Sequence, residues 1–378
     1  VTANGIIYVG EQTGIFHILK DEGERCVSLH RQEFKRDDDA VDEIYGSPAV
    51  ASGRVYFMTR YGTYCLGDPS KMVESGEMPA AAEETGGSGE GGERHCHIEP
   101  AEVTTAPGES VTFHALVTGP TGMKFRSLRE PTWSSAGVKG TINEHGVLEV
   151  GKDNAFSAGQ VKVSGEGIEG SARIRVVPKL PISEDFEAIE AGGVPPGWLG
   201  VGAKTRIEER DGSKVLRKLA PKERPTPPVM RLMAFATPVI EGGYVVQADM
   251  MSLPKKRFKS DMGLMNSRYT MLLTGQNELQ VESWASIPRF RHAIPMEWKT
   301  ETWYRAKVEG KLEGDKARVR AKAWPRDSEE PAEWMVDVVD PCPNREGAAG
   351  LYAYSTNTTP KSDGPESFFD NFRVWKEE

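Results

Sequence analysis

The feature that most constrains the fold is an internal repeat with a period of 48 residues. The segment NGIIYVGEQTGIFHIL, residues 4–19, is repeated as SGRVYFMTRYGTYCLG, residues 52–67. Tyr8 corresponds to Tyr56, Gly14 to Gly62 and Phe16 to Tyr64. Each copy alternates apolar and polar residues between turn-forming glycine pairs, which predicts a β-hairpin. With a third strand expected over residues 26–34, the period is typical of the blades of a β-propeller.

The repeat also resembles a known family. The stretch SPAVASGRVYFMTRYGTYCLG, residues 47–67, is similar to the repeat of PQQ-type β-propellers, which include quinoprotein alcohol dehydrogenases and quinone-free outer-membrane assembly lipoproteins. The resemblance covers residues 1–68, but the tryptophan of such repeats is replaced by Val27-Ser28-Leu29. Because a propeller closes with about four to eight blades, the resemblance implies further blades upstream in a longer parent. Two copies form no central funnel, so we expect no PQQ in this chain.

Composition predicts three further segments. Residues 69–94 contain EMPAAAEETGGSGEGGER, and this Gly, Ser and Glu content predicts a flexible acidic linker. Residues 95–178 carry short alternating stretches at 111–117, 146–150, 159–164 and 170–177, the spacing of a β-sandwich. Their order, from PGESVTF through TWSS and GVLEV to GQVKVSGEG, resembles bacterial immunoglobulin-like domains of group 2. That resemblance makes Trp133 the core tryptophan.

The last segment, residues 179–378, is rich in aromatic and valine-containing strands. Its opening DFE…GW and closing FDNFRV resemble the first and last strands of concanavalin-A-like jelly rolls, as in laminin-G-like modules. The resemblance implies that these two strands pair. The predicted fold class is therefore all-β: partial propeller blades, an immunoglobulin-like sandwich and a jelly-roll sandwich. Lectins, binding modules and glycosidases share that last fold, so the fold alone does not define a function.

Charge and cysteine content exclude some functions and leave others open. The net charge is −9 and the pI is about 5.5, which argues against nucleic-acid binding through phosphates. No apolar run is long enough to span a membrane. The four cysteines have no CxxC spacing; Cys26 and Cys65 are expected to be buried, and the sequence leaves pairing of Cys96 with Cys342 open. The family resemblances imply an extracytoplasmic protein, whether periplasmic, outer-membrane-associated or secreted.

Four oxygen-bearing residues near the two terminal strands of the jelly roll form a candidate metal site: Asp185, Glu187, Asp370 and Asn371. If these strands pair, the side chains converge, and Ca²⁺ takes six to eight oxygen ligands. The resemblance adds that jelly-roll modules often hold a structural calcium ion there. The alternative is ordinary turn capping by Asp and Asn.

A ligand-binding surface is predicted from aromatic and cationic residues of the jelly roll. Trp284 precedes a charged stretch, and an aromatic ring on an open sheet face can stack on a sugar ring; packing in the core is the alternative for each aromatic residue. The candidates are Trp284, Arg289, Arg291, His292, Tyr269 and Trp303. A binding site also needs a concave surface with a few convergent polar groups, which the arginines and the histidine would supply.

No catalytic residue is assigned from the sequence. Glycoside hydrolysis needs a pair of carboxylates, and we interpret Glu278 and Glu282, four apart on one strand face, as exposed charges on an outer sheet. No GxSxG motif is present. We therefore expect a non-catalytic binding or scaffold protein whose jelly roll binds a carbohydrate or another surface ligand. Two alternatives stay open: an enzyme, either a quinoprotein dehydrogenase with upstream catalytic blades or a jelly-roll glycoside hydrolase, and a purely structural interaction module.

Overall fold

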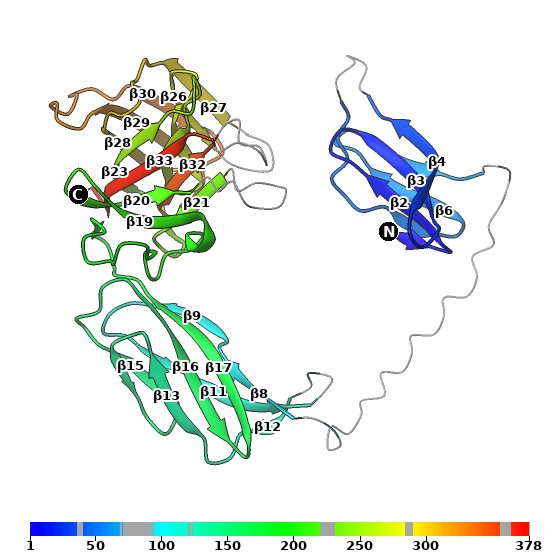
Figure 1. Ribbon diagram of the computed structural model, residues 1–378, viewed down its shortest axis with the longest axis horizontal. Helices are drawn as coiled ribbons and strands as arrows, with labels where there is room; N and C mark the ends of the chain where they lie inside the picture. Colours follow the sequence, from blue (N-terminus) through cyan, green and yellow to red (C-terminus); the bar gives the residue numbers. More distant parts are fainter. Residues whose placement is uncertain are drawn as a thin grey trace. The chain divides into compact units, whose positions relative to one another are not determined.

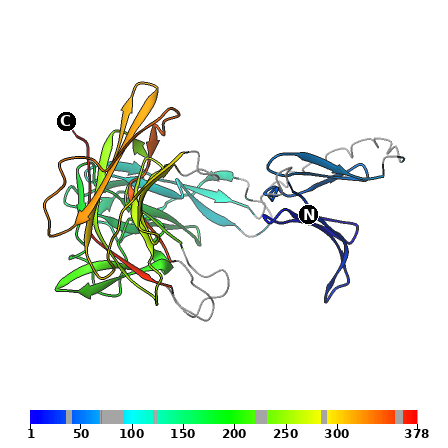
Figure 2. The ribbon, with the colours of Figure 1, turned by 90° about the horizontal axis from the view of Figure 1, so that it is seen from above.

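The computed structural model describes residues 1–35, 41–68, 70, 92, 94–119, 122, 124–219, 231–283, 290–355 and 364–377. The chain divides into two compact units, Val1–Gly86 and Gly87–Glu378. Figures 1 and 2 show strands throughout, and within the described ranges the one helix is a short 3-10 turn, η1, Gly202–Lys204. The all-β prediction is confirmed. Most of the predicted linker, residues 69–94, lies outside the described residues.

The N-terminal unit consists of two small antiparallel sheets, one for each copy of the repeat. The first has the order β1-β2-β3-β4 and the second β5-β6-β7. The strands are β1 Thr2–Ala3, β2 Ile6–Gly10, β3 Ile15–Asp21, β4 Cys26–Glu33, β5 Ala49–Ala51, β6 Arg54–Met58 and β7 Thr63–Leu66. When the first copy is shifted by 48 residues along the sequence, β2 aligns with β6 and β3 aligns with β7. The sequence repeat therefore corresponds to a repeated strand arrangement. Cys26 and Cys65 are exposed in their strands, which corrects the expectation that they are buried.

The first part of the second unit contains three small sheets around its own core. The core centres on Ile98, Leu148, Val161 and Ile174, and Trp133 packs against it while partly exposed. The sheets have the orders β10-β15-β14, β12-β11-β8 and β13-β16-β17-β9. The strands are β8 His95–Glu99, β9 Glu102–Thr105, β10 Ser110–Thr112, β11 His114–Thr118, β12 Lys124–Ser127, β13 Thr132–Ala136, β14 Gly140–Ile142, β15 Val147–Val150, β16 Ser157–Gly165 and β17 Ile168–Val176.

One predicted strand of this part is divided in the structure. The sequence predicts a single strand over residues 111–117, whereas β10 and β11 belong to different sheets. The chain passes from one sheet to the other at Phe113, whose amide donates a hydrogen bond to the carbonyl of Gly146 and whose ring is buried. A switch of partners at one residue leaves the alternation of apolar and polar residues intact, so the sequence pattern does not reveal it.

The C-terminal part is a β-sandwich of two antiparallel sheets. An eight-stranded sheet has the order β19-β20-β33-β23-β28-β29-β30, with β18 also pairing with β33, and a six-stranded sheet has the order β21-β32-β24-β25-β26-β27. The strands are β18 Ile182–Glu184, β19 Thr205–Arg210, β20 Ser213–Lys218, β21 Arg231–Phe235, β22 Ile240–Glu241, β23 Tyr244–Leu253, β24 Asp261–Asn266, β25 Tyr269–Thr274, β26 Glu278–Ser283, β27 Phe290–Pro295, β28 Tyr304–Glu313, β29 Lys316–Pro325, β30 Val336–Asp340, β31 Glu346–Gly347, β32 Gly350–Tyr354 and β33 Glu366–Trp375.

The pairing of β18 with β33 confirms the predicted contact between the first and last strands of this segment, with Ile182 opposite Val374. The largest apolar core of the protein fills the space between the two sheets and includes Val246, Leu264, Met271 and Phe372. Alternation along each strand then leaves the other set of side chains on the outer face of its sheet.

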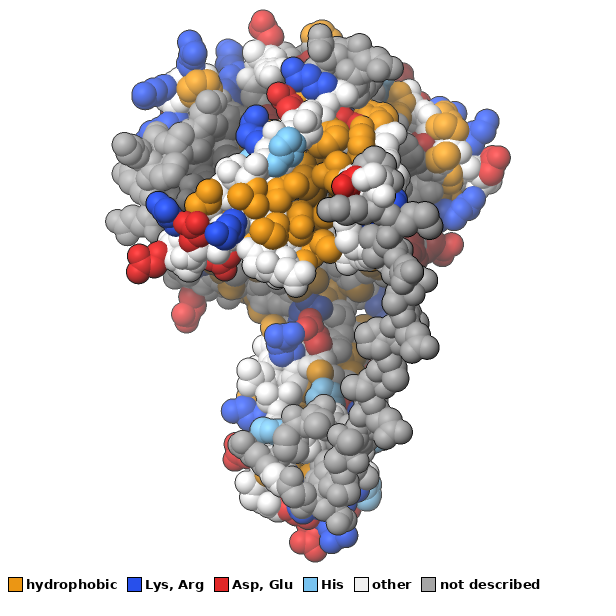
Figure 3. Space-filling view, turned by 90° about the vertical axis from the view of Figure 1, so that its right-hand side faces the viewer, with side chains coloured by type: hydrophobic (Ala, Val, Ile, Leu, Met, Phe, Trp, Pro, Cys, Tyr) orange, Lys and Arg blue, Asp and Glu red, His pale blue; other side chains and the backbone are white. Residues whose placement is uncertain are grey.

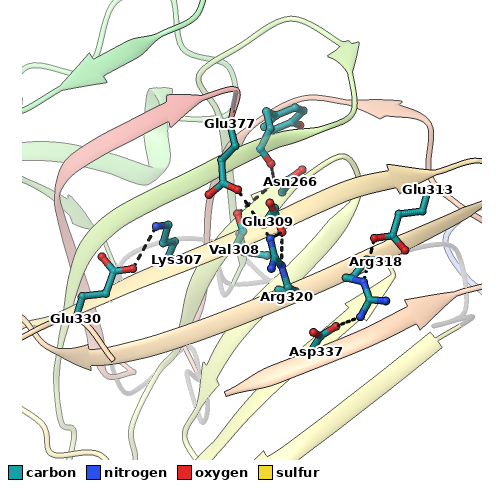
Figure 4. Close-up of polar contacts among 11 residues, drawn as sticks. Asn266, Lys307, Val308, Glu309, Glu313, Arg318, Arg320, Glu330, Asp337 and Glu377 are labelled. Carbon is teal, nitrogen blue, oxygen red and sulfur yellow. Dashed lines mark hydrogen bonds and ion pairs between the residues drawn. The ribbon is translucent and has the colours of Figure 1, made fainter. Parts of the chain in front are cut away.

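The outer faces of the two sheets differ in chemistry. On the eight-stranded sheet, surface ion pairs dominate: Arg318 lies 3.0 Å from Glu313 and 2.9 Å from Asp337, and Lys307 lies 3.2 Å from Glu330 (Figure 4). The opposite charges in such exposed ion pairs neutralise each other, and the pairs contribute little to the stability of the fold. The outer face of the six-stranded sheet is hollowed instead, as the next subsection describes.

Candidate ligand-binding groove

A groove of about 520 Å³ lies on the outer face of the six-stranded sheet. Its position follows from alternation: Met262 and Leu264 of β24 and Leu279 and Val281 of β26 point into the core. The residues between them therefore point outward into the groove. The lining includes Arg231, Asp261, Leu272, Gln280, Glu282, Arg291, Tyr352 and Tyr354.

The floor of the groove is apolar and partly made of backbone. Leu272 of β25 and Tyr352 of β32 are each 5% exposed and pack together outside the main core. Gly263 of β24 lies between them, opposite Leu272 on one side and Tyr352 on the other. A Cβ atom at Gly263 would collide with the carbonyl oxygen of Met271. The glycine therefore keeps the middle of the sheet face hollow.

A chain of hydrogen-bonded polar side chains crosses one side of the groove. Arg291 of β27 donates through Nε to Gln280 Oε1 at 2.7 Å, and Gln280 Nε2 donates to Glu282 Oε2 at 2.8 Å. Arg291 also lies 3.6 Å from Glu278. Gln280 and Glu282 are only 5% and 7% exposed. Because each side chain is held by its neighbour, the polar groups of this side of the groove are already oriented before any ligand arrives.

Two carboxyl groups in the groove have shifted acidities. Burial raises the pKa of Asp261, although its Oδ1 accepts a hydrogen bond of 2.7 Å from the amide of Gly275. Burial also raises the pKa of Glu282; the charge of Asp261 adds to that rise, while the charge of Arg291 opposes it. The two carboxyl groups therefore interact with each other. Shifts caused by burial together with a specific charge partner in a concave site are typical of functional groups.

The opposite side of the groove carries aromatic and cationic side chains. The guanidinium carbon of Arg231 lies 6.0 Å from the centre of the Tyr354 ring, and the two residues are opposite each other in β21 and β32. Phe258 is partly exposed, with the Arg257 guanidinium carbon 5.3 Å from its ring centre. The groove thus combines aromatic rings on one side with a fixed polar chain on the other.

Of the six residues predicted to bind a ligand, Arg291 is a groove residue. Trp284 and Arg289 lie outside the described residues. His292 is exposed on β27 but is the strand neighbour of Arg291, so its side chain points to the other face of that strand.

Tyr269 and Trp303 are buried in this structure, which agrees with the alternative that they pack in the core. Tyr269 is fully buried; its hydroxyl donates to Asp340 Oδ2 at 2.8 Å and accepts from the amide of Asn344 at 3.0 Å. Trp303 is 9% exposed and packs in a separate small cluster with Val215. Neither ring presents a face on which a sugar can stack.

The four candidate metal ligands do not form one cluster. Glu187 and Asp370 both accept hydrogen bonds from the Ser213 hydroxyl, at 2.6 and 3.4 Å. Asp185 accepts instead from the amide of Glu187, and Asn371 Nδ2 donates to Asp249 at 3.0 Å. Among the residues that the structure describes, no group of three or more His, Cys, Asp or Glu side chains is arranged to hold a metal ion. The oxygens turn to nearby donors, as in the turn-capping alternative.

The cysteines and the absence of long apolar runs can also be compared with the structure. Cys96 and Cys342 are not joined by a disulfide. No helix in the described part of the chain is long and apolar enough to cross a membrane.

Sequence reasoning missed most of the groove. Glu282, interpreted as an exposed charge, is 7% exposed, and Asp261, Gln280, Tyr352 and Tyr354 were not singled out. A usable signal was present in ELQVES, residues 278–283, where three polar residues with long side chains alternate with apolar ones in the middle of an otherwise apolar sheet. The alternation shows that these three residues share one face of the strand, but it does not show that this outward face is buried.

Comparison with known proteins assigns the chain to no family. No protein-family model matches the sequence, and no curated protein matches it. One similar solved structure is arcelin-5, a lectin-like defense protein from Phaseolus vulgaris, with 7% identity and a TM-score of 0.28 over 53% of this chain and 100% of that one. Another is a bifunctional GH43-CE protein of Bacteroides eggerthii, with 12% identity and a TM-score of 0.30 over 100% of this chain. This chain spans half the length of that second protein. Both likenesses are too distant to assign a family.

Proposed function

We propose that the C-terminal β-sandwich is a carbohydrate-binding module and that the groove on its six-stranded sheet is the binding site. The observation that carries the proposal is a hydrogen-bonded chain on an outward sheet face, in which the exposed Arg291 donates to Gln280 and Gln280 donates to Glu282, both of them buried. Burying a carboxyl and an amide on an outer face has a free-energy cost. An arrangement that offers fixed donors and acceptors to a ligand would account for keeping them there.

The groove suits a sugar because it offers two kinds of contact at once. Hydroxyl groups around a sugar ring both donate and accept hydrogen bonds, and the chain of carboxyl, amide and guanidinium groups matches both roles. The flat C–H face of the ring can lie on an aromatic side chain, whose π-system carries a negative face. Tyr354, partly exposed at the edge of the groove beside Arg231, is the residue that we assign to this stacking contact.

The rest of the chain is assigned on resemblance. We propose that the C-terminal sandwich is a concanavalin-A-like jelly roll, that residues 95–178 form an immunoglobulin-like spacer, and that the N-terminal unit is a pair of PQQ-type blades without a quinone. The same resemblances support an extracytoplasmic location. In this proposal the protein acts as a binding or scaffold protein outside the cytoplasm.

A second candidate function is glycoside hydrolysis, favoured by the shifted acidities of Asp261 and Glu282. A glycosidase needs one carboxyl group that stays protonated to act as the acid and another that is ionised. Two interacting carboxyl groups with raised pKa values cannot easily both ionise, so one of them would hold its proton to a higher pH. The groove would then cleave the sugar that it binds.

Glycan binding is tested first. The full chain is tested on a broad glycan array together with the Arg231→Ala variant and a matched control, Arg318→Ala, which removes an outward arginine from the other sheet. Binding predicts that wild type and Arg318→Ala retain the same glycans, and that Arg231→Ala loses at least about tenfold in affinity, the size of a lost charge-assisted contact. Retention of no glycan by wild type, or equal losses in both variants, refutes the proposal.

Hydrolysis is tested on the glycans that bind. Turnover by wild type that is abolished in Glu282→Gln, with binding retained, would establish the enzyme. Bound glycans that stay intact would leave a binding module without catalysis.

A further inference from the structure

A turn that carries four cations borders the groove on the six-stranded sheet. It joins β23 to β24 and has the sequence KKRFK, residues 255–259; we call it the cationic turn. Its first three residues are exposed, and its last three line the groove. The chain as a whole has a net charge of −9, and on the face that Figure 3 presents, cationic and acidic side chains mostly lie interspersed. The cationic turn therefore concentrates positive charge at one edge of the groove.

The conformation of the cationic turn is fixed by its own backbone. The amide of Lys255 donates to the carbonyl of Phe258, and the amide of Phe258 donates to the carbonyl of Lys255, each at 3.0 Å. These bonds close a two-residue hairpin turn with Lys256 and Arg257 at its tip. Lys256 has a φ of 56°, in the left-handed region that glycine adopts most easily. A lysine is a less stable choice than glycine at this position, which points to a role for its charge.

The base of the cationic turn is anchored beside the groove. Lys259 Nζ donates to Asn277 Oδ1 at 2.7 Å and to the carbonyl of Trp298 at 2.5 Å, and it lies 4.4 Å from the centre of the Trp298 ring. The backbone of Lys259 packs equally closely, because a Cβ atom at Gly275 would lie 2.7 Å from its carbonyl oxygen. Since both the side chain and the backbone of Lys259 are held, the tip of the turn keeps a defined position relative to the groove.

The charges of the groove differ in whether they already have a partner. Its three carboxyl groups do: Glu278 lies 3.6 Å from Arg291, Glu282 accepts a hydrogen bond from Gln280, and Asp261 accepts one from a backbone amide. In the described ranges, by contrast, no carboxylate forms an ion pair with any of the three exposed cations of the turn. The charge that the groove can offer to a ligand is therefore positive, and a cation binds an anionic group with a charge-assisted hydrogen bond.

We propose that the groove binds an acidic sugar and that the cationic turn holds its anionic substituent. This inference rests on the proposed carbohydrate binding and adds the class of sugar. The substituent is a carboxylate or a sulfate ester, since both present several acceptor oxygens to guanidinium and ammonium groups. Arg257 is the residue that we assign to the direct contact, because it alone of the three exposed cations lines the groove. Lys255 and Lys256 raise the positive potential around it.

The test compares glycans that differ in charge alone. The glycan array for the full chain includes two matched pairs: an oligogalacturonide with its methyl ester, and a sulfated galactan oligosaccharide with its desulfated form. Wild type should bind the charged member of at least one pair more tightly by about tenfold or more, the size of one charge-assisted contact. The pair that shows this preference identifies the carboxylate or the sulfate as the source of the charge. Added salt should weaken the preference, because ions screen exposed charges.

Two variants of the turn show whether it is the source of the preference. Arg257→Ala should lower the affinity ratio of the charged over the uncharged glycan about tenfold, and Lys256→Gly about threefold. Lys311→Ala, which removes an exposed lysine of β28 on the other sheet, is the matched control and should keep the wild-type ratio. Because glycine relieves the positive φ at position 256, Lys256→Gly should melt at no lower temperature than wild type. A lower ratio in this variant then reports the lost charge and not a damaged fold.

Three results would overturn the inference, and they differ in what else they refute. If wild type retains glycans but binds both members of each pair equally, or prefers neutral glycans, the acidic class is wrong while the carbohydrate-binding proposal stands. If wild type prefers the charged member and both turn variants keep that preference, the cationic turn is not its source. If wild type retains no glycan, the proposed function fails and this inference fails with it.

Discussion

Replacing Asp370 by asparagine should stabilise the C-terminal β-sandwich at neutral pH. Asp370 of β33 is 3% exposed and lies opposite Asp249 of β23, which is fully buried. Arg305 neutralises Asp249 through two hydrogen bonds of 2.7 and 2.9 Å. Asp370 accepts hydrogen bonds from the amide of Asn371 at 2.7 Å and the hydroxyl of Ser213 at 3.4 Å. Burial, with the nearby charge of Asp249, raises the pKa of Asp370 from 3.8 to about 6.

The size and sign of the effect follow from proton linkage. A pKa that rises from 3.8 to about 6 on folding corresponds to about 3 kcal/mol. Because the folded state holds the proton more tightly, the contribution of Asp370 is most favourable below about pH 4 and is lost as the pH rises to about 6. Asparagine has the same shape without the charge. The variant should therefore gain up to about 3 kcal/mol in unfolding free energy near pH 7.5.

Urea unfolding of the full chain, followed by tryptophan fluorescence, measures this difference, because Trp198 and Trp298 are buried in the core of the sandwich. The Asp370→Asn variant should also lose the part of the pH dependence between about pH 4 and pH 6. Asp337→Asn, at a half-exposed ion pair with Arg318, is the matched control and should change stability by less than about 1 kcal/mol. A variant no more stable than wild type at neutral pH, or an unchanged pH dependence, would refute the reasoning.

Three further predictions concern the same sandwich. Arg305→Met leaves the charge of Asp249 buried without its partner and should destabilise the sandwich by about 3–5 kcal/mol in the same urea experiment; a loss under about 1 kcal/mol would contradict this. Gly263→Ala forces a methyl group against the carbonyl of Met271 and should cost about 3 kcal/mol, whereas Gly202→Ala, with nothing within 4 Å of the new methyl group, should be near neutral by thermal unfolding. Millimolar calcium should leave the melting temperature of the full chain unchanged, since the four predicted ligands do not converge; a clear upward shift that a chelator reverses would restore the calcium hypothesis.

The groove illustrates why buried polar groups in a sandwich deserve a functional interpretation. The ion pairs on the outer face of the eight-stranded sheet are mostly partly exposed, as with Arg318 and Asp337. On the six-stranded sheet, Gln280 and Glu282 are almost fully buried although they point away from the core. Buried carboxyl groups also occur on the eight-stranded sheet, where Asp249 pairs with Arg305 and Glu309 with Arg320; what separates the two surfaces is that Gln280 and Glu282 line a groove.

Local sequence determined the strands and the repeat, because alternation and turn chemistry act over a few residues. The hairpins of residues 4–19 and 52–67 and the strand Cys26–Glu33 were predictable in this way, whereas the pairing of Ile182–Glu184 with Glu366–Trp375 was implied only by the family resemblance. Alternation states which residues share a strand face, but it does not state which face is covered, since this depends on strands far away in the sequence. Cys65, expected to be buried, is exposed for this reason, and Tyr269, expected to bind, is buried.

The tertiary structure alone decided where the groove lies. Asp261, Gln280, Glu282 and Tyr352 come from three strands, and only the sheet order β32-β24-β25-β26 brings them to one surface. Their acidities and hydrogen bonds depend on burial, which is a property of the packed sheet and not of any segment. The repeat shows the converse: the sequence alone relates Tyr8 to Tyr56 and Val9 to Phe57, but only the packed unit shows that Tyr8 and Phe57 pack in its core while Tyr56 and Val9 are exposed, because burial is set by a neighbouring sheet.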